Sequence, residues 1–178
     1  EKGLVGGRYS GGAGAKTAIT IDSGTPEKVP ASDASRYIPQ AEPVLTLKQY
    51  LEALSFHIKD PDLGIFTPES RRFFRQWLVT DAQQDNEFRR LLRNLPAAEV
   101  RIAGERAVIF FPVADRQVAP YFLRRGSEGW MLDFTGMNRW IAFNHKNQWH
   151  FKSLDHPYRF GFEHLAFDRH GFPHERPK

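Results

Sequence analysis

Apolar and polar residues recur at helical spacing between positions 46 and 95 of the chain. In the stretch "TLKQYLEALSFHIKD" apolar residues return every third or fourth position, which predicts a helix that buries one face. Thr46 is placed to cap this helix, and Asp60-Pro61 ends it. The predicted buried face consists of Leu47, Tyr50, Leu51, Leu54 and Ile58.

Two capping patterns predict two more helices. Thr67 is a suitable N-cap, and Pro68 after it suits the first helical position. Thr80 and Gln83 have the spacing of a capping box, so a third helix is expected to begin there and to end before Pro96. The apolar face expected for the second helix consists of Phe73, Phe74, Trp77 and Leu78, and that for the third of Phe88, Leu91, Leu92 and Leu95.

Beyond residue 96 the period of the pattern changes to two, as expected of strands. "AEVRIAGERAVIFFPV" predicts two strands joined at 103–105, and "VAPYFLRRGSEGWMLDF" predicts a hairpin that turns at 126–129. Residues 135–151 fit either a strand pair that turns at 144–147 or a short helix followed by a strand. The pattern leaves these two alternatives open.

Helices followed by antiparallel strands predict an α+β fold, with three N-terminal helices packed on a curved antiparallel sheet and extended tails at both ends. The composition divides the chain into three parts. Residues 1–43 are rich in Gly, Ser and Pro and read as an extended arm or linker. Residues 44–151 form the α+β domain, and residues 152–178 are an aromatic and histidine-rich C-terminal tail.

The order of these elements resembles the nuclear-transport-factor-2-like superfamily, in which helices pack into the concave face of a sheet to make a cone. The resemblance rests on the helix at 47–58, on "GIFTPESRRFFRQW" and on the strand segments "RAVIFFPV" and "YFLRRGSEGWMLDF", which together span residues 45–135. It implies pockets between the helices and the sheet. The superfamily contains enzymes, ligand binders and domains that only hold assemblies together, so the resemblance leaves the function open.

The composition excludes several kinds of site. The chain has no cysteine, which excludes disulfides, thiolate nucleophiles and cysteine-containing zinc sites. Its net charge of +4 is spread along the chain, so nucleic acid is not an expected partner. No apolar run reaches the roughly 18–20 residues that span a bilayer. Because the chain begins at Glu1 and not at Met, we expect that a signal peptide, a membrane anchor or another segment has been removed.

Three residues are the best candidates for acid–base chemistry in a cone-type pocket. Asp133 and Tyr121 lie on predicted strands, and His57 lies near the end of the first helix. Each also has a structural interpretation. Strand alternation places Asp133 on the face opposite Leu132, toward solvent, and His57 suits a helix C-terminus, where a cation is favoured. A small-molecule-binding or catalytic domain is therefore an alternative and not the leading hypothesis.

Six of the seven histidines lie at or after position 145, which raises the possibility of a metal site. His164, His170 and His174 stand among carboxylates, and this mixture of ligands suits zinc or iron. However, Gly171 and Pro173 argue against a helix there, and none of the usual zinc spacings is present. A His/carboxylate metalloprotein is the second alternative, and no cofactor is expected.

The leading hypothesis is a non-enzymatic accessory or scaffolding subunit of a larger protein assembly, one that docks through its extended tails. We expect a bacterial cell-envelope assembly, with the chain periplasmic or peripheral to a membrane, although the sequence also fits the cytoplasm. Its partners would be other protein subunits. The expected aromatic anchors are Phe160, Phe162, Phe167 and Phe172. The expected polar contacts are Arg71, Arg72 and Arg75.

Overall fold

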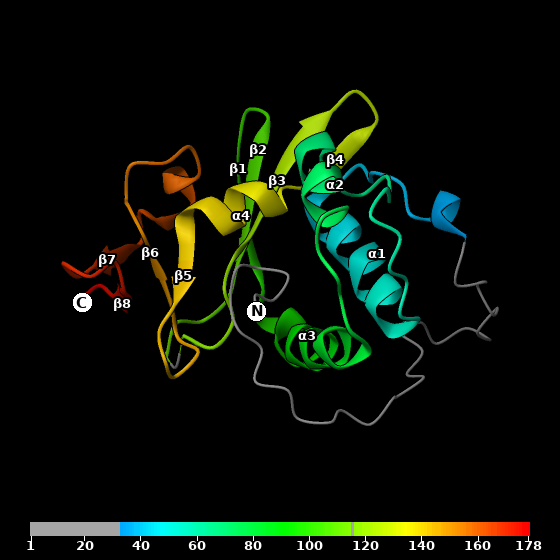
Figure 1. The fold of residues 1–178 in the computed structure, drawn as a ribbon. Coiled ribbons are helices and arrows are strands. Elements are labelled where there is room, and N and C mark those ends of the chain that lie inside the picture. Colours follow the sequence, from blue (N-terminus) through cyan, green and yellow to red (C-terminus); the bar gives the residue numbers. More distant parts are fainter. Residues whose placement is uncertain (1–32, 115) are drawn as a thin grey trace.

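Figure 1 shows the fold in a computed structural model of the chain, which describes residues 33–114 and 116–178. Residues 1–32 of the predicted arm lie outside the described part, and the arm's described end carries a short 3-10 helix, η1 (Ala34–Arg36). Arg36 Nε donates to a Glu52 carboxylate oxygen at 2.8 Å and attaches this end of the arm to the first long helix. No helix among the described residues is long and apolar enough to cross a bilayer.

The first long helix, α1 (Pro43–Ser55), begins one turn earlier than predicted. The prediction that Thr46 caps it is wrong, because Pro43 occupies the first turn and Glu42 stands at the cap position. Thr46 is instead fully buried, and its Oγ1 donates to the Trp130 carbonyl oxygen at 2.9 Å. The hydroxyl therefore joins the helix to the sheet.

The two predicted capping patterns are confirmed. Thr67 Oγ1 accepts from the Ser70 amide at 3.2 Å and caps α2 (Pro68–Phe74). The Thr80–Gln83 capping box opens α3 (Asp81–Asn94), which is followed by a 3-10 turn, η2 (Leu95–Ala97). Because α2 ends at Phe74, the apolar face predicted for it is too long: Trp77 and Leu78 lie in the link to α3, and Leu78 is 89% exposed.

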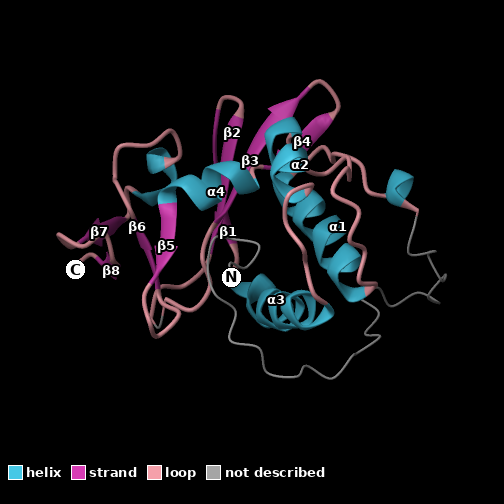
Figure 2. Cartoon of the chain, viewed as in Figure 1, coloured by secondary structure: helices cyan, strands magenta, loops and turns pink. Residues whose placement is uncertain are grey.

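The main sheet is a four-stranded antiparallel meander in which each strand pairs with the next. Its strands are β1 (Glu99–Ala103), β2 (Arg106–Phe110), β3 (Tyr121–Gly126) and β4 (Gly129–Leu132). Both predicted hairpins are confirmed, and each closes in a two-residue turn, at 104–105 and at 127–128. Helices and an antiparallel sheet together confirm the α+β class (Figure 2).

The segment left open by the sequence pattern contains both of the elements that were weighed. A short helix, α4 (Phe134–Trp140), follows the main sheet, and a separate antiparallel pair, β5 (Ile141–Phe143) with β6 (Trp149–Phe151), follows the helix. The Asp133 carboxylate accepts from the Gly136 amide at 3.0 Å and so starts the helix directly after β4.

Both faces of the central strands are covered. Successive residues of β3 point to opposite faces: the Tyr121 hydroxyl reaches Glu87 on α3, whereas the Phe122 ring stacks on Tyr158 at 4.1 Å. The helices α1 and α3 therefore cover one face and the C-terminal residues cover the other, which agrees with their places on either side of the sheet in Figure 1. This explains why the last four residues of β2 are all buried.

Residues 152–178 fold back onto the domain. They form a 3-10 helix, η3 (Arg159–Phe162), and a hairpin of β7 (Leu165–Phe167) with β8 (Pro173–Glu175). Gly161 of this segment lies so close to the sheet that a Cβ there would come within 2.8 Å of the Val108 side chain. The segment is thus in direct contact with the core of the domain.

The aromatic residues expected to act as docking anchors mostly contact this chain itself. Phe162 is 3% exposed and belongs to the hydrophobic core, so its expected docking role is corrected. Phe160 and Phe167 are half-buried and pack against the same core. Phe172 is also half-buried and lies 4.7 Å from the His150 ring. Their side chains contribute to stability, because they complete the second layer over the sheet.

Candidate functional site

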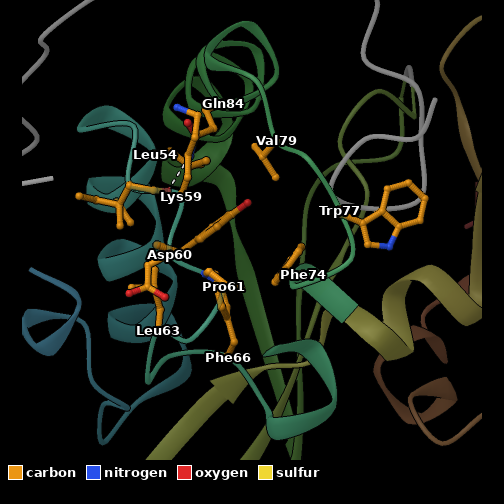
Figure 3. A pocket seen from close by; sticks show the side chains of 13 residues that line it. Leu54, Lys59, Asp60, Pro61, Leu63, Phe66, Phe74, Trp77, Val79 and Gln84 are labelled. Carbon is orange, nitrogen blue, oxygen red and sulfur yellow. Dashed lines mark hydrogen bonds between the residues drawn. The ribbon is translucent and has the colours of Figure 1, made fainter. Parts of the chain in front are cut away.

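A cleft opens between α1, the loop that follows it and the link between α2 and α3 (Figure 3). Its volume is about 400 Å³, counted out to the surrounding solvent. In Figure 3, Leu54, Lys59 and Pro61 lie on one side of the cleft and Phe74 and Val79 on the other, and its upper end is formed by Gln84. The part of this space that a water-sized molecule can enter is about 30 Å³, well below the roughly 300–1,000 Å³ of typical ligand pockets, but its lining is mostly apolar like theirs.

The wall of the cleft next to α1 is shaped by the way this helix ends. His57 adopts a positive φ of 53°, its amide donates to the Leu54 carbonyl at 3.1 Å, and the Ile58 amide donates to Ala53 at 2.9 Å. These two bonds form a Schellman motif, in which the residue after the αL position packs against the last turn of the helix. Ile58 and Ala53 accordingly both line the cleft.

The floor of the cleft belongs to a cluster of aromatic rings. Phe66 lies 4.9 Å from Phe74 and 5.9 Å from Tyr50, measured between ring centroids. Phe134 lies 5.5 Å from Phe66 and 6.2 Å from Tyr121, so the cluster extends from the cleft to β3. Such tilted and edge-on pairs are the preferred arrangements of aromatic rings in cores.

Beneath this floor lies a buried carboxyl group that is bound by two tyrosines. The Tyr50 hydroxyl, from α1, lies 2.7 Å from Glu87 Oε1, and the Tyr121 hydroxyl, from β3, lies 2.8 Å from Glu87 Oε2. Glu87 lies on α3 and is only 2% exposed. Because Tyr50 also lines the cleft, one hydrogen bond separates the cleft floor from the carboxyl group.

Burial raises the pKa of Glu87 from 4.5 to about 7. The loss of hydration disfavours the charged carboxylate, whereas the hydrogen bonds from Tyr50 and Tyr121 and the positive charge of Arg90 favour it and limit the rise in pKa. A buried acid with such a pKa can gain or lose a proton near neutral pH. Groups of this kind are enriched at functional sites, which makes Glu87 a candidate for a functional role.

Two contacts between a basic side chain and a carboxylate lie close to the cleft, near its Lys59 side. His57 Nε2 lies 2.6 Å from the buried carboxylate of Asp85, and Lys59 contacts Asp81. Both carboxylates belong to the first two turns of α3, where the helix dipole favours negative charge. These pairs attach the loop after α1 to α3 and hold this side of the cleft in place.

Comparison with known proteins does not assign the chain to a family. Protein-family models, characterised proteins and solved structures were each compared with the chain, and none of them matches it. The resemblance to the nuclear-transport-factor-2-like superfamily stays a prediction that rests on element order.

The three residues predicted for acid–base chemistry have different partners in the structure. Tyr121 binds Glu87, and His57 binds Asp85. Asp133 is 9% exposed, caps α4 and lies 2.5 Å from the Tyr158 hydroxyl. The solvent-facing orientation predicted for Asp133 by strand alternation is therefore wrong, because β4 ends at Leu132 and the chain turns into a helix.

The three tail histidines predicted as possible metal ligands also contact different residues. The His164 ring lies 4.5 Å from the Phe110 ring in a tilted arrangement, whereas His174 Nε2 lies 2.9 Å from an Asp168 oxygen. His170 contacts its neighbour Arg169. Within residues 33–114 and 116–178, no group of three or more His, Asp or Glu side chains is arranged to hold a metal ion.

The three arginines predicted as partner contacts differ in the hydrogen bonds that their side chains make. Arg71 is half-buried and donates to the Leu63 carbonyl at 3.2 Å, and Arg75 Nε donates to Asp62 at 2.9 Å. Both therefore hold the loop that precedes α2. Arg72 is exposed.

Sequence reasoning missed Glu87 and Gln84, although a signal for both was present. They precede Leu91 by about one and two helical turns, so they share the buried face of α3. A polar residue on an apolar helix face is either satisfied by a partner inside the protein or available to a ligand. Glu87 is an example of the first case, and the Gln84 amide nitrogen also donates within the protein, to the Ile58 carbonyl oxygen.

Proposed function

We propose that this domain binds a small, mainly apolar molecule in the cleft between α1 and the α2–α3 link. The observation that carries the proposal is the lining of the cleft, whose walls are aromatic and aliphatic. Its polar groups are few, and they stand at defined places on the floor and at the edges: Tyr50, Lys59, Asp60 and Gln84. Apolar walls with a few directed polar groups are typical of ligand sites in proteins.

Val79→Trp is expected to block the cleft and to weaken the binding of apolar fragments at least tenfold. Val79 is half-buried in the α2–α3 link, and a larger side chain there would occupy the space that a ligand needs. Binding is measured by ligand-detected NMR with a library of neutral and charged fragments. The matched control is Leu78→Trp, one residue earlier, where the side chain is 89% exposed and the substitution should leave binding unchanged. Equal fragment binding by wild type and Val79→Trp would contradict the proposal.

A second candidate function, the accessory subunit of an envelope assembly, is favoured by a different surface. An open groove of about 1,250 Å³, counted out to solvent, runs between the outer sides of α1 and α3. It is lined in part by Val44, Leu45, Leu92, Leu95 and Pro96, and Leu45 is 40% exposed. The rest of the lining includes Gln40, Lys48, Gln49 and Glu52, and exposed grooves that combine apolar and polar side chains in this way are typical of protein contacts.

Leu45→Glu is expected to abolish co-purification with a partner subunit, if the groove is a docking surface, because it places a charge in an apolar contact. The measurement is native mass spectrometry of untagged protein isolated from its own source. Ile102→Glu is the matched control, because Ile102 is 55% exposed but lies on β1, outside the groove. A wild-type chain that migrates as a bare monomer would contradict this second candidate.

A further inference from the structure

Two arginines lie directly opposite each other on the two central strands of the main sheet. Arg106 of β2 is paired with Arg124 of β3, so both side chains stand on the same face. Residues paired in this way have Cβ atoms roughly 4.5–5.5 Å apart, and like charges at this spacing destabilise a sheet. An anion beside the two arginines would remove this repulsion, whether it belongs to the protein or is bound from outside.

Only part of this positive charge is neutralised within the described part of the chain. Arg124 Nη2 donates to Glu69 Oε1, on α2, at 2.5 Å, and the Glu69 side chain is 43% exposed. The Arg106 side chain makes no hydrogen bond or ion pair with any of residues 33–114 and 116–178. Its Cζ lies 5.7 Å from the centroid of the Tyr158 ring. Among the described residues, Arg106 therefore has an aromatic neighbour but no bonded anion.

The buried carboxylate of Asp133 is not bonded to either arginine. Its Oδ1 accepts from the Gly136 amide at 3.0 Å and its Oδ2 from the Tyr158 hydroxyl at 2.5 Å. Burial raises the pKa of Tyr158, whereas Arg106 and Arg124 both lower it. The two guanidinium groups thus lie within electrostatic reach of one hydroxyl, and their positive potentials add up at this place.

Both arginines remain partly exposed, although the inner part of each side chain is buried. The two Nε atoms are buried, so a ligand cannot reach them. The Arg124 side chain is nevertheless 34% exposed, and Arg106 is half-buried. We therefore assign the contact with a ligand to the Nη groups, which lie beyond Nε at the end of each side chain and donate in a fixed plane.

The charge and the shape of the pair select the kind of anion. A carboxylate has one negative charge and two oxygens, which a single guanidinium already matches in a bidentate pair. A phosphate group on a larger molecule has about two negative charges and three acceptor oxygens, so it can accept from two arginines at once.

We infer that Arg106 and Arg124 form a binding site for a phosphate group. The site goes beyond the proposed function, because it lies on the face of the sheet that carries Phe122 and the C-terminal segment, opposite the cleft. Arg106 is the principal contact, because Arg124 also holds Glu69.

The probes are inorganic phosphate and phenyl phosphate, and their dissociation constants are measured by NMR titration of the full chain at constant ionic strength. Arg106→Met is expected to weaken the binding of both probes about tenfold or more, because it removes charge-assisted hydrogen bonds. Arg125→Met is the matched control and should leave binding unchanged. Arg125 is the next residue of β3, points to the opposite face and is bound to Glu105.

Glu69→Gln gives an expectation of the opposite sign. It removes the carboxylate that competes with the ligand for Arg124, so both probes should bind several-fold more tightly than they bind to wild type. A lower dissociation constant for phenyl phosphate than for inorganic phosphate would indicate a phosphate group carried by a larger molecule, and the reverse order would indicate the free ion. Either order supports the inference.

Three results would overturn it. The first is a wild-type chain that binds neither probe, and the second is an Arg106→Met variant that binds both probes as tightly as wild type does. The third is an equal loss in Arg106→Met and Arg125→Met, because the attraction would then come from the net charge and not from this pair. Should Arg106→Met not fold, an unchanged dissociation constant in Glu69→Gln would by itself overturn the inference.

Discussion

Deletion of residues 153–178 is expected to unfold the domain. This segment supplies Tyr158, Phe162 and Leu165 to the hydrophobic core, where each is at most 6% exposed. Without them the face of β3 that carries Phe122 would be open to water, and the loss of each large buried side chain costs about 3–5 kcal/mol. Since a domain of this kind is stable by only about 5–15 kcal/mol, the truncated chain should lose its cooperative unfolding transition. Circular dichroism and urea titration measure this directly.

A point substitution tests the same contact without removing the whole segment. Tyr158→Ala should lower the free energy of unfolding by about 3–5 kcal/mol, because it removes the ring stacked on Phe122 and the hydroxyl bound to Asp133. Tyr158→Phe keeps the ring and should cost about 1–3 kcal/mol, because Asp133 then lacks a buried donor. Deletion of the two exposed residues 177–178 is the control and should change little. A truncated chain that stays folded would show instead that residues 153–178 are a detachable docking arm.

The features predicted correctly from the sequence are those that depend on neighbouring residues. The Thr67 cap and the Thr80–Gln83 capping box each involve groups three residues apart, so the sequence alone is sufficient to recognise them. The two hairpins follow in the same way from short turns between alternating strands. The prediction for Thr46 failed because threonine is a common N-cap residue, whereas the start of α1 is determined by Pro43, three residues earlier.

The features that the sequence did not predict depend on contacts between distant parts of the chain. Tyr50 and Tyr121 lie 37 and 34 positions from Glu87, and only the packing of α1, α3 and β3 brings the three side chains together. The C-terminal segment misled for a related reason. Its aromatic residues have no regular spacing, because they pack from a 3-10 helix and a short hairpin and not from one long element. The irregular spacing therefore led to the prediction of an extended tail. In the structure, the segment forms a second layer that covers one face of the main sheet.

These contacts also bear on how the proposed site is built. The cleft lies on the helical side of the sheet, where the described side chains leave space beside the aromatic cluster, whereas the opposite face of β3 is closed by the C-terminal segment. The C-terminal layer supports the strand on which Tyr121 lies, and Tyr121 in turn holds Glu87 beneath the cleft floor. The proposed site and the C-terminal layer therefore lie on opposite faces of the same sheet.

Glu87→Gln is expected to remove a large pH dependence of stability. The pKa of Glu87 is about 7 in the folded protein and would be near its ordinary value of 4.5 in the unfolded chain. Between these two values the folded state keeps a proton that the unfolded state has released, so the free energy of unfolding falls as the pH rises through this window. The shift of about 2.5 pKa units corresponds to roughly 3 kcal/mol. Glutamine cannot ionise and has the shape of the protonated acid, so the free energy of unfolding of the variant should not fall over this pH range.

Urea unfolding of wild type and Glu87→Gln from about pH 4.5 to about pH 8 measures the effect. The two proteins should be equally stable at the acidic end, and the variant should be more stable by roughly 3 kcal/mol at the alkaline end. Glu128→Gln, in the exposed β3–β4 turn, is the matched control and should follow the wild-type curve. Tyr121→Phe should extend the window to higher pH, because the hydrogen bond that it removes lowers the pKa of Glu87. Parallel curves for wild type and Glu87→Gln would mean that Glu87 stays ionised in the folded protein, held by its two tyrosines and Arg90.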